Sequence, residues 1–177
     1  MGLSQDVIDK YLEAGKIAKE VKNDSINDIE PGMKVVDLVK LVEKRIKDRG
    51  AGIAFPCNVS INEVAAHYTS PKDDETKIEK GDYLKLDLGV HVDGYIADTA
   101  TTTKVGEEKD GLMESAEQAL EEAKKQMKPG NIVGEIGGKI EDTIKSYGFS
   151  PIINLSGHKM ERYDLHTGVS LPNIKKT

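Results

Sequence analysis

Two aspartates in adjacent β-rich segments have a spacing that could support chemistry. Asp87 and Asp98 lie in the two runs that flank Asp93-Gly94, and this dipeptide is a strong signal for a two-residue hairpin turn. Because the numbers of facing residues then sum to 187, Asp98 faces Gly89, and Asp87 is its diagonal neighbour on the same face. The hairpin therefore places two carboxylates within side-chain reach of each other.

The chemistry open to this pair follows from the repulsion between its like charges. Strand interiors disfavour aspartate, and two carboxylates on one face destabilise a sheet unless a cation, a shared proton or full solvation offsets the repulsion. One interpretation is a metal or catalytic site that contains Asp87 and Asp98. The alternative is that both side chains point into solvent.

The four histidines offer further ligands or proton carriers. His158 lies in a glycine-containing turn, His166 follows eight residues later, His67 lies in an apolar neighbourhood, and His91 adjoins the hairpin turn and has the weakest case. A single histidine in an apolar stretch is more often a core residue than a ligand. Together, however, carboxylates and imidazoles suit a divalent ion such as Mn, Fe, Co or Zn.

The segments that position these residues alternate between helix and strand. Apolar residues at three-and-four spacing predict four amphipathic helices, and the hairpin supplies the clearest strands. Residues 149–177 are expected to form short strands and turns. The four helices are expected at residues 5–28, at 35–46 with a cap at Gly50, at 112–127, and at 132–144 with an end at Gly148.

An internal repeat with an offset of 98 residues organises these elements. Pro31-Gly32 matches Pro129-Gly130, and Gly50 matches Gly148, with similar residues at the apolar positions between them. Each copy leads into a short strand segment, at 58–60 and at 154–156. The repeat predicts a duplicated helix–turn–helix–strand unit, hence a pseudo-symmetric fold with helices on one face of an antiparallel sheet. The alternative is that there is no duplication, because any two Pro-Gly turns followed by amphipathic helices look alike.

Composition excludes several classes of function. The 177 residues carry 25 Lys and Arg against 31 Asp and Glu, a net charge of −6, which argues against nucleic acid as a partner. No apolar run approaches the length needed to span a membrane, and no secretory leader opens the chain. Cys57, the one cysteine, is either a nucleophile or, more commonly, a small core residue. A cytoplasmic protein without membrane contact is expected.

Four segments resemble the signature segments of the type II methionine aminopeptidases, in their archaeal form. They are residues 54–69, 86–100, 154–158 and 165–168. The resemblance implies an α+β fold called the pita-bread fold, in which an antiparallel sheet is covered by helices and two halves are related by a pseudo-twofold. The chain would then form a single domain over residues 1–177, with repeat units at roughly 5–105 and 106–177.

The resemblance also implies a two-metal site. In that family the residues matching Asp87, Asp98 and His158 are metal ligands, with the residue at Asp98 bridging, and two glutamate ligands lie further along the chain. The cofactors implied are two divalent ions, either Mn, Fe, Co or Zn. Such ions lower the pKa of a bound water and polarise the scissile carbonyl.

The remaining family positions concern the substrate. His67 and His166 match two site histidines that hydrogen-bond the substrate and stabilise the developing intermediate, while Phe55 and Leu165 match positions that line a methionine pocket. The implied substrates are peptides or proteins that begin with Met. Two alternative functions are a related peptidase that acts before proline and a non-catalytic binding half with the pita-bread fold.

The sequence departs from the family pattern at three places. Thr167 stands where Ala is usual, and Ser70 interrupts the usual Tyr-Thr-Pro run. The third departure is that the sequence ends at Thr177, before the segments that carry both glutamates in the family. The expectation is therefore conditional: alone, these residues would bind metal weakly and have little activity, whereas a second chain or a longer product that supplies the glutamates would restore it.

Overall fold

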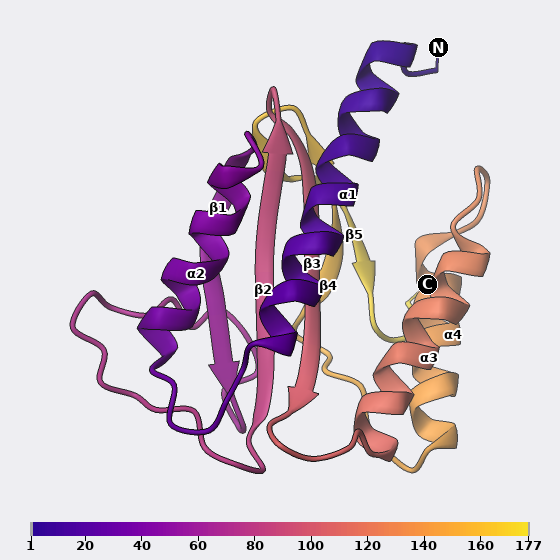
Figure 1. Ribbon diagram of the computed structural model, residues 1–177. Coiled ribbons are helices and arrows are strands. Elements are labelled where there is room, and N and C mark those ends of the chain that lie inside the picture. Colours follow the sequence, from indigo (N-terminus) through magenta and orange to yellow (C-terminus); the bar gives the residue numbers. More distant parts are fainter. Residues whose placement is uncertain (1, 177) are drawn as a thin grey trace. The chain divides into compact units, whose positions relative to one another are not determined.

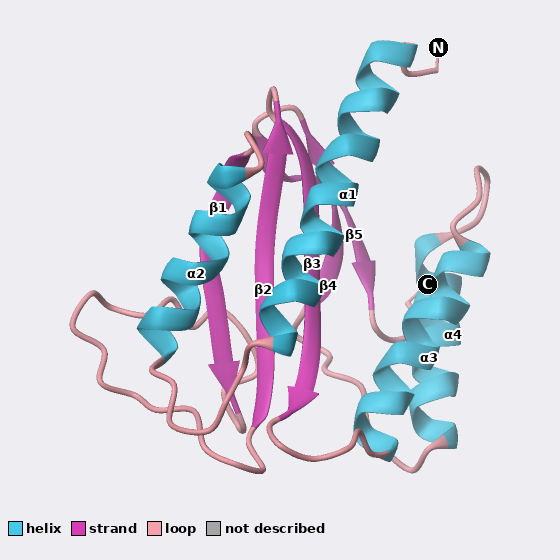
Figure 2. Ribbon diagram, viewed as in Figure 1, coloured by secondary structure: helices cyan, strands magenta, loops and turns pink. Residues whose placement is uncertain are grey.

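The structure is a computed structural model, and it describes residues 2–176 (Figures 1 and 2). These residues form two compact units. The first unit holds the chain up to Glu108 together with Glu161–Leu165, and the second holds Lys109–Met160 and the residues from His166 onward. Within residues 2–176, no helix is long and apolar enough to cross a membrane. The elements are α1 (Gln5–Asn27), α2 (Val35–Asp48), β1 (Gly52–Ile61), β2 (Tyr83–Val92), β3 (Tyr95–Lys104), α3 (Gly111–Gln126), α4 (Val133–Ser146), β4 (Ser156–Glu161) and β5 (Asp164–Pro172).

The first unit is an antiparallel sheet in the order β1-β2-β3 with two helices packed on one face. Helix α1 lies against β2 and β3, and α2 lies against β1, as Figure 1 shows. Leu84, Leu86 and Leu88 of β2 are fully buried in the core that also holds Val21 of α1 and Val42 of α2. Side chains alternate between the two faces of a strand, so the residues between these leucines lie on the face away from the helices.

The predicted hairpin is confirmed. Asp93 and Gly94 both have positive φ, 51° and 86°, which is the type I′ turn that matches the right-handed twist of the strands. The register pairs Gly89 with Asp98 and Asp87 with Ala100. Facing residues therefore sum to 187 along the whole ladder, as the turn predicts.

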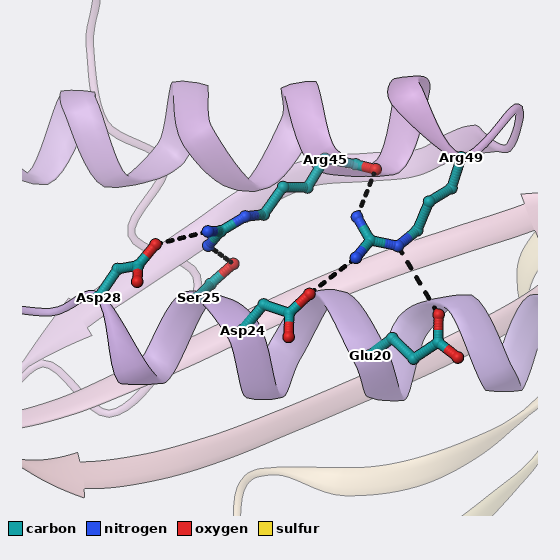
Figure 3. A network of polar contacts seen from close by, with 6 residues as sticks. All are labelled: Glu20, Asp24, Ser25, Asp28, Arg45 and Arg49. Carbon is teal, nitrogen blue, oxygen red and sulfur yellow. Dashed lines mark hydrogen bonds and ion pairs between the residues drawn. The ribbon is translucent and has the colours of Figure 1, made fainter.

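Helices α1 and α2 are joined by two arginines (Figure 3). Arg45 donates to the hydroxyl of Ser25, at 3.1 Å, and forms an ion pair with Asp28. Arg49 donates to Asp24 at 2.7 Å and to the carbonyl of Arg45 at 3.2 Å. Because Ser25 is fully buried, Arg45 satisfies a polar group that water does not reach, and the two arginines hold α1 and α2 together.

The second unit contains the helix pair α3 and α4, and it also contains most of the two-stranded β4-β5 sheet. Its small core is formed by Ala119 and Ala123 of α3 against Ile136 and Ile140 of α4. The segment 172–176 crosses α4 at Gly137: a Cβ built there would lie 2.3 Å from the carbonyl oxygen of Ile174. Only glycine permits this approach of backbone to backbone.

The internal repeat is visible in the backbone. Helices α2 and α4 both have 14 residues, and their first residues are 98 positions apart. Gly50 and Gly148, with φ of 74° and 83°, end the two helices, and each donates its N–H to the carbonyl three residues earlier at 2.9 Å. Matched glycine caps after matched helices confirm the pseudo-symmetric α+β organisation that the sequence predicts.

One of the two predicted strand segments is confirmed, and the other needs correction. The segment 58–60 belongs to a longer strand, β1, which has ten residues and two register shifts around Phe55. In the second copy, residues 151–155 are irregular and β4 begins only at Ser156. The physical reason is Asn173, whose side-chain amide donates to the carbonyls of Ile152 and Leu155, each at 3.0 Å, and so holds them in a loop.

Candidate functional site

The predicted carboxylate pair lies on the face of the three-stranded sheet that α1 and α2 do not cover. Asp87 and Asp98 are half-buried and lie on adjacent strands, on the face opposite α1 and α2. Asp98 pairs with Gly89, so Asp87 is its diagonal neighbour, a geometry in which side chains remain within reach. A rigid hairpin thus holds two like charges together on a partly desolvated surface, where a divalent cation would offset their repulsion.

Phe55 borders this pair. A Cβ built on Gly89 would lie 2.3 Å from Cε1 of Phe55 and 3.0 Å from Cβ of Ala54. The ring therefore lies over the bare backbone of Gly89, which is the residue paired with Asp98. The two register shifts of β1 flank Phe55, and such bulges re-aim side chains. The structure brings this predicted pocket residue next to the carboxylates.

Asn58 connects the carboxylate pair to the β1–β2 loop. It lies opposite Asp87 in the register, and its Nδ2 donates to Oδ2 of Asp87 at 3.5 Å, the long end of the hydrogen-bond range. Its Oδ1 accepts from the hydroxyl of Thr69 at 2.7 Å. Sequence reasoning missed Asn58 because its role depends on the β1–β2 register, which no turn signal determines. The one sequence feature that could have indicated a role for Asn58 is its polar side chain within a largely buried strand.

His67 lies on that loop, close to its attachment to β1. The next residue, Tyr68, accepts from the backbone N–H of Val59 at 3.0 Å, and Thr69 bridges to Asn58. His67 is exposed and has a φ of 65°, a conformation uncommon for a residue other than glycine. The alternative of a buried core histidine is therefore wrong for His67, although its apolar sequence neighbourhood favoured it.

The other predicted site residues are found on β4 and β5. The rings of His158 and His166 have centroids 4.2 Å apart, so these two imidazoles form a pair within the second unit. Leu165, half-buried, belongs to the first unit. Thr167, at the position where Ala is usual in the family, donates its hydroxyl to the carbonyl of Lys159 at 3.2 Å, which ties β5 to β4.

Two residues considered from the sequence have other roles. His91 accepts from the N–H of Gly94 at 3.2 Å and packs edge-on against Tyr163, with ring centroids 5.6 Å apart. It therefore supports the hairpin turn. Cys57 is buried, and burial, followed by the nearby carboxylates of Glu43 and Asp87, raises the pKa of its thiol. A thiol held protonated in the core is a poor nucleophile.

The donors that lie together fit part of a metal site. Carboxylate oxygens are suitable ligands for divalent ions, and Asp87 and Asp98 provide them from rigid strands. Within residues 2–176, no group of three or more His, Cys, Asp or Glu side chains forms a complete candidate metal site. The assignment of His158 as a third ligand thus remains a prediction.

Comparisons with known proteins agree with this fold. The model of metallopeptidase family M24 matches residues 9–177. A methionine aminopeptidase from Thermococcus onnurineus is 56% identical over 169 residues, covering 96% of this chain and 57% of the relative. One from Methanothermus fervidus is 44% identical over 181 residues, covering 95% and 96%. The crystal structure of a methionine aminopeptidase from Thermotoga maritima has a TM-score of 0.89 at 28% identity, covering 98% of this chain and 73% of that one.

These matches show that the chain has the α+β pita-bread fold of methionine aminopeptidase structures. More particularly, the chain belongs to metallopeptidase family M24, as a homologue of the archaeal methionine aminopeptidases. It spans about 57% of the length of the Thermococcus relative.

Proposed function

We propose that this chain supplies Asp87, Asp98 and His158 as ligands of a two-metal site that removes N-terminal methionine from peptides. The observation that carries the proposal is the aspartate pair on one face of the sheet, with the ring of Phe55 over the glycine beside it. Identity of 56% to a methionine aminopeptidase favours this substrate over peptides with proline in the second position.

Each residue has a distinct task in the proposed reaction. Bound divalent ions, of the Mn, Fe, Co or Zn kind, would supply Lewis acidity and an acidified water. Phe55 and Leu165 would hold the methionine side chain by apolar contact. His67 and His166 would donate hydrogen bonds to the oxygen on which negative charge develops, because charge stabilisation at that point lowers the barrier most.

Full activity would require more donors than these three residues. Two divalent ions held only by Asp87, Asp98 and His158 would keep several water ligands and bind weakly. The remaining carboxylates would come from a second chain or from a longer product. The exposed apolar side chains of the second unit, such as Ile132 and Ile153, at 66% and 68% exposure, are suitable for covering by such a partner.

The test is methionine release from a short peptide with added Mn²⁺ or Co²⁺. The proposal predicts little turnover by the purified 177-residue chain and substantial turnover once the missing carboxylates are supplied by the C-terminal part of a relative. Robust release by the 177-residue chain alone would show that no further ligands are needed. Release from Xaa-Pro peptides, but not from Met peptides, would favour the rival peptidase.

Analytical ultracentrifugation, combined with the methionine-release assay, tests a second alternative, in which the chain is a non-catalytic binding half. A non-catalytic binding half would associate with a partner chain and yet release no methionine from the complex at any metal concentration. The proposed enzyme would gain activity on association. The same samples therefore distinguish an enzyme from a structural half.

A further inference from the structure

A carboxylate outside the proposed site organises the loop that carries His67. Asp74 lies between β1 and β2 and is only 9% exposed. Its Oδ2 accepts from the hydroxyls of Tyr68 and Ser70, at 3.0 and 2.8 Å, and its Oδ1 accepts from the backbone N–H of Thr76 at 2.9 Å. Three donors from three positions thus converge on one buried side chain, which closes residues 68–76 into a compact loop.

The first of these donors belongs to the residue that follows His67. The backbone N–H of Tyr68 donates to the hydroxyl of Ser60 in β1 at 3.3 Å, and its ring hydroxyl reaches Asp74 on the other side. Tyr68 is therefore fixed at both its backbone and its ring. His67, the residue before it, has the left-handed conformation, with φ of 65°, which an unrestrained histidine seldom adopts.

Ser70 contributes a side-chain donor to this arrangement. At this position the family pattern has proline, which carries no hydroxyl. Here the hydroxyl of Ser70 makes the shortest of the contacts to Asp74, at 2.8 Å. The serine therefore gives Asp74 a donor from within the loop itself.

We infer that Asp74 is a positioning residue for His67: through Tyr68 and Ser70 it holds the imidazole-bearing segment against β1, at the end of the path Thr69–Asn58–Asp87. Asp74 would touch neither substrate nor metal. The inference rests on the proposed function for the use made of His67, but the conformation itself is a property of the loop. It can therefore be tested without any activity.

The experiment is nuclear magnetic resonance on the full chain and on three variants. In Asp74→Ala, the HN–Hα coupling and ¹³C shifts of His67 should move away from left-handed values, and the amide of Thr76 should exchange with solvent at least about ten-fold faster. Asp74→Asn should retain the wild-type conformation of His67, because its amide can still accept from Thr76 and donate to the two hydroxyls. Asp73→Ala, which removes the exposed neighbouring carboxylate, should change neither quantity.

A purely structural role for Asp74 predicts a different pattern. If the role is purely structural, Asp74→Ala is less stable than the wild type, but His67 keeps its left-handed conformation in the folded population. That result would overturn the inference. Should Asp74→Ala not fold, Tyr68→Phe and Ser70→Ala decide: shifts at His67 support the inference and unchanged shifts refute it. These results do not depend on methionine release, so the proposed function can fail or hold separately.

Discussion

The ring of Phe55 lies directly over the backbone of Gly89, with Cε1 2.3 Å from the place where a Cβ would stand. Gly89 is the residue of β2 that pairs with Asp98, and it lies two positions after Asp87. The contact links β1 to β2 where the register of β1 shifts. Glycine at this position therefore lets an aromatic wall approach the two carboxylates.

Gly89→Ala is expected to displace the Phe55 ring. The added methyl overlaps both the ring and Ala54, and overpacking of this kind costs about 1–3 kcal/mol. Urea unfolding followed by circular dichroism measures the change in the free energy of unfolding. Gly15→Ala is the matched control, since nothing lies within 4 Å of a Cβ at this position in α1; it should be stabilising by up to about 1 kcal/mol.

Two adjacent glycines of α4 should respond differently to the same substitution. A Cβ at Gly137 would lie 2.3 Å from the carbonyl oxygen of Ile174, whereas the nearest atoms to a Cβ at Gly138 belong to the side chain of Lys175, at 3.4 Å. Gly137→Ala should therefore release the segment 172–176 from α4 and destabilise the second unit, as amide exchange of that segment would show. Equal protection in both variants would contradict the close backbone approach.

The arginine network between α1 and α2 should depend chiefly on Arg45. Its removal leaves the buried hydroxyl of Ser25 without this donor, so Arg45→Ala should lower the free energy of unfolding by about 1–2 kcal/mol. Lys44→Ala removes an exposed ion pair with Asp48 on the same helix and should cost less than about 0.5 kcal/mol. Denaturant titration of both variants measures the difference, which should vanish if the Arg45 contacts contribute nothing.

Acid should weaken the loop around Asp74 only at low pH. Burial opposes ionisation of Asp74, but hydrogen bonds from Thr76, Ser70 and Tyr68 outweigh it and lower its pKa from 3.8 to about 2. A carboxyl with a lowered folded-state pKa stabilises the fold above its unfolded pKa and loses this contribution as the pH falls through the folded value. The stability difference between wild type and Asp74→Asn should therefore be constant above pH 5, shrink below about pH 4 and be nearly gone by about pH 2. A difference that does not change between pH 5 and pH 2.5 would contradict the lowered pKa.

The hairpin was predictable because its register depends on local chemistry. Asp93-Gly94 selects a two-residue turn, and the turn alone pairs Gly89 with Asp98. The repeat was also predictable from the sequence, because the helix caps at Gly50 and Gly148 need the same backbone geometry. Both features are determined by residues close together in the sequence.

The features that sequence reasoning missed depend on contacts between distant residues. The link from Asn58 to Asp87 depends on a pairing 29 residues apart, interrupted by register shifts. The irregular stretch before Ser156 depends on Asn173, 18 residues beyond the carbonyl of Leu155 that it contacts. Periodicity describes a segment alone, so neither contact leaves a local signal.

The central claim, a metal site built on Asp87 and Asp98, is tested most directly by Mn²⁺ binding to the 177-residue chain. Paramagnetic Mn²⁺ broadens the signals of nearby nuclei and so locates even weak binding. Backbone amides at Gly89 and Asp98 should broaden first in the wild type. Asp98→Asn should abolish this effect, and Asp93→Asn, which keeps the turn of the same hairpin, should preserve it. Equal broadening at these amides in the wild type and in Asp98→Asn would contradict the claim.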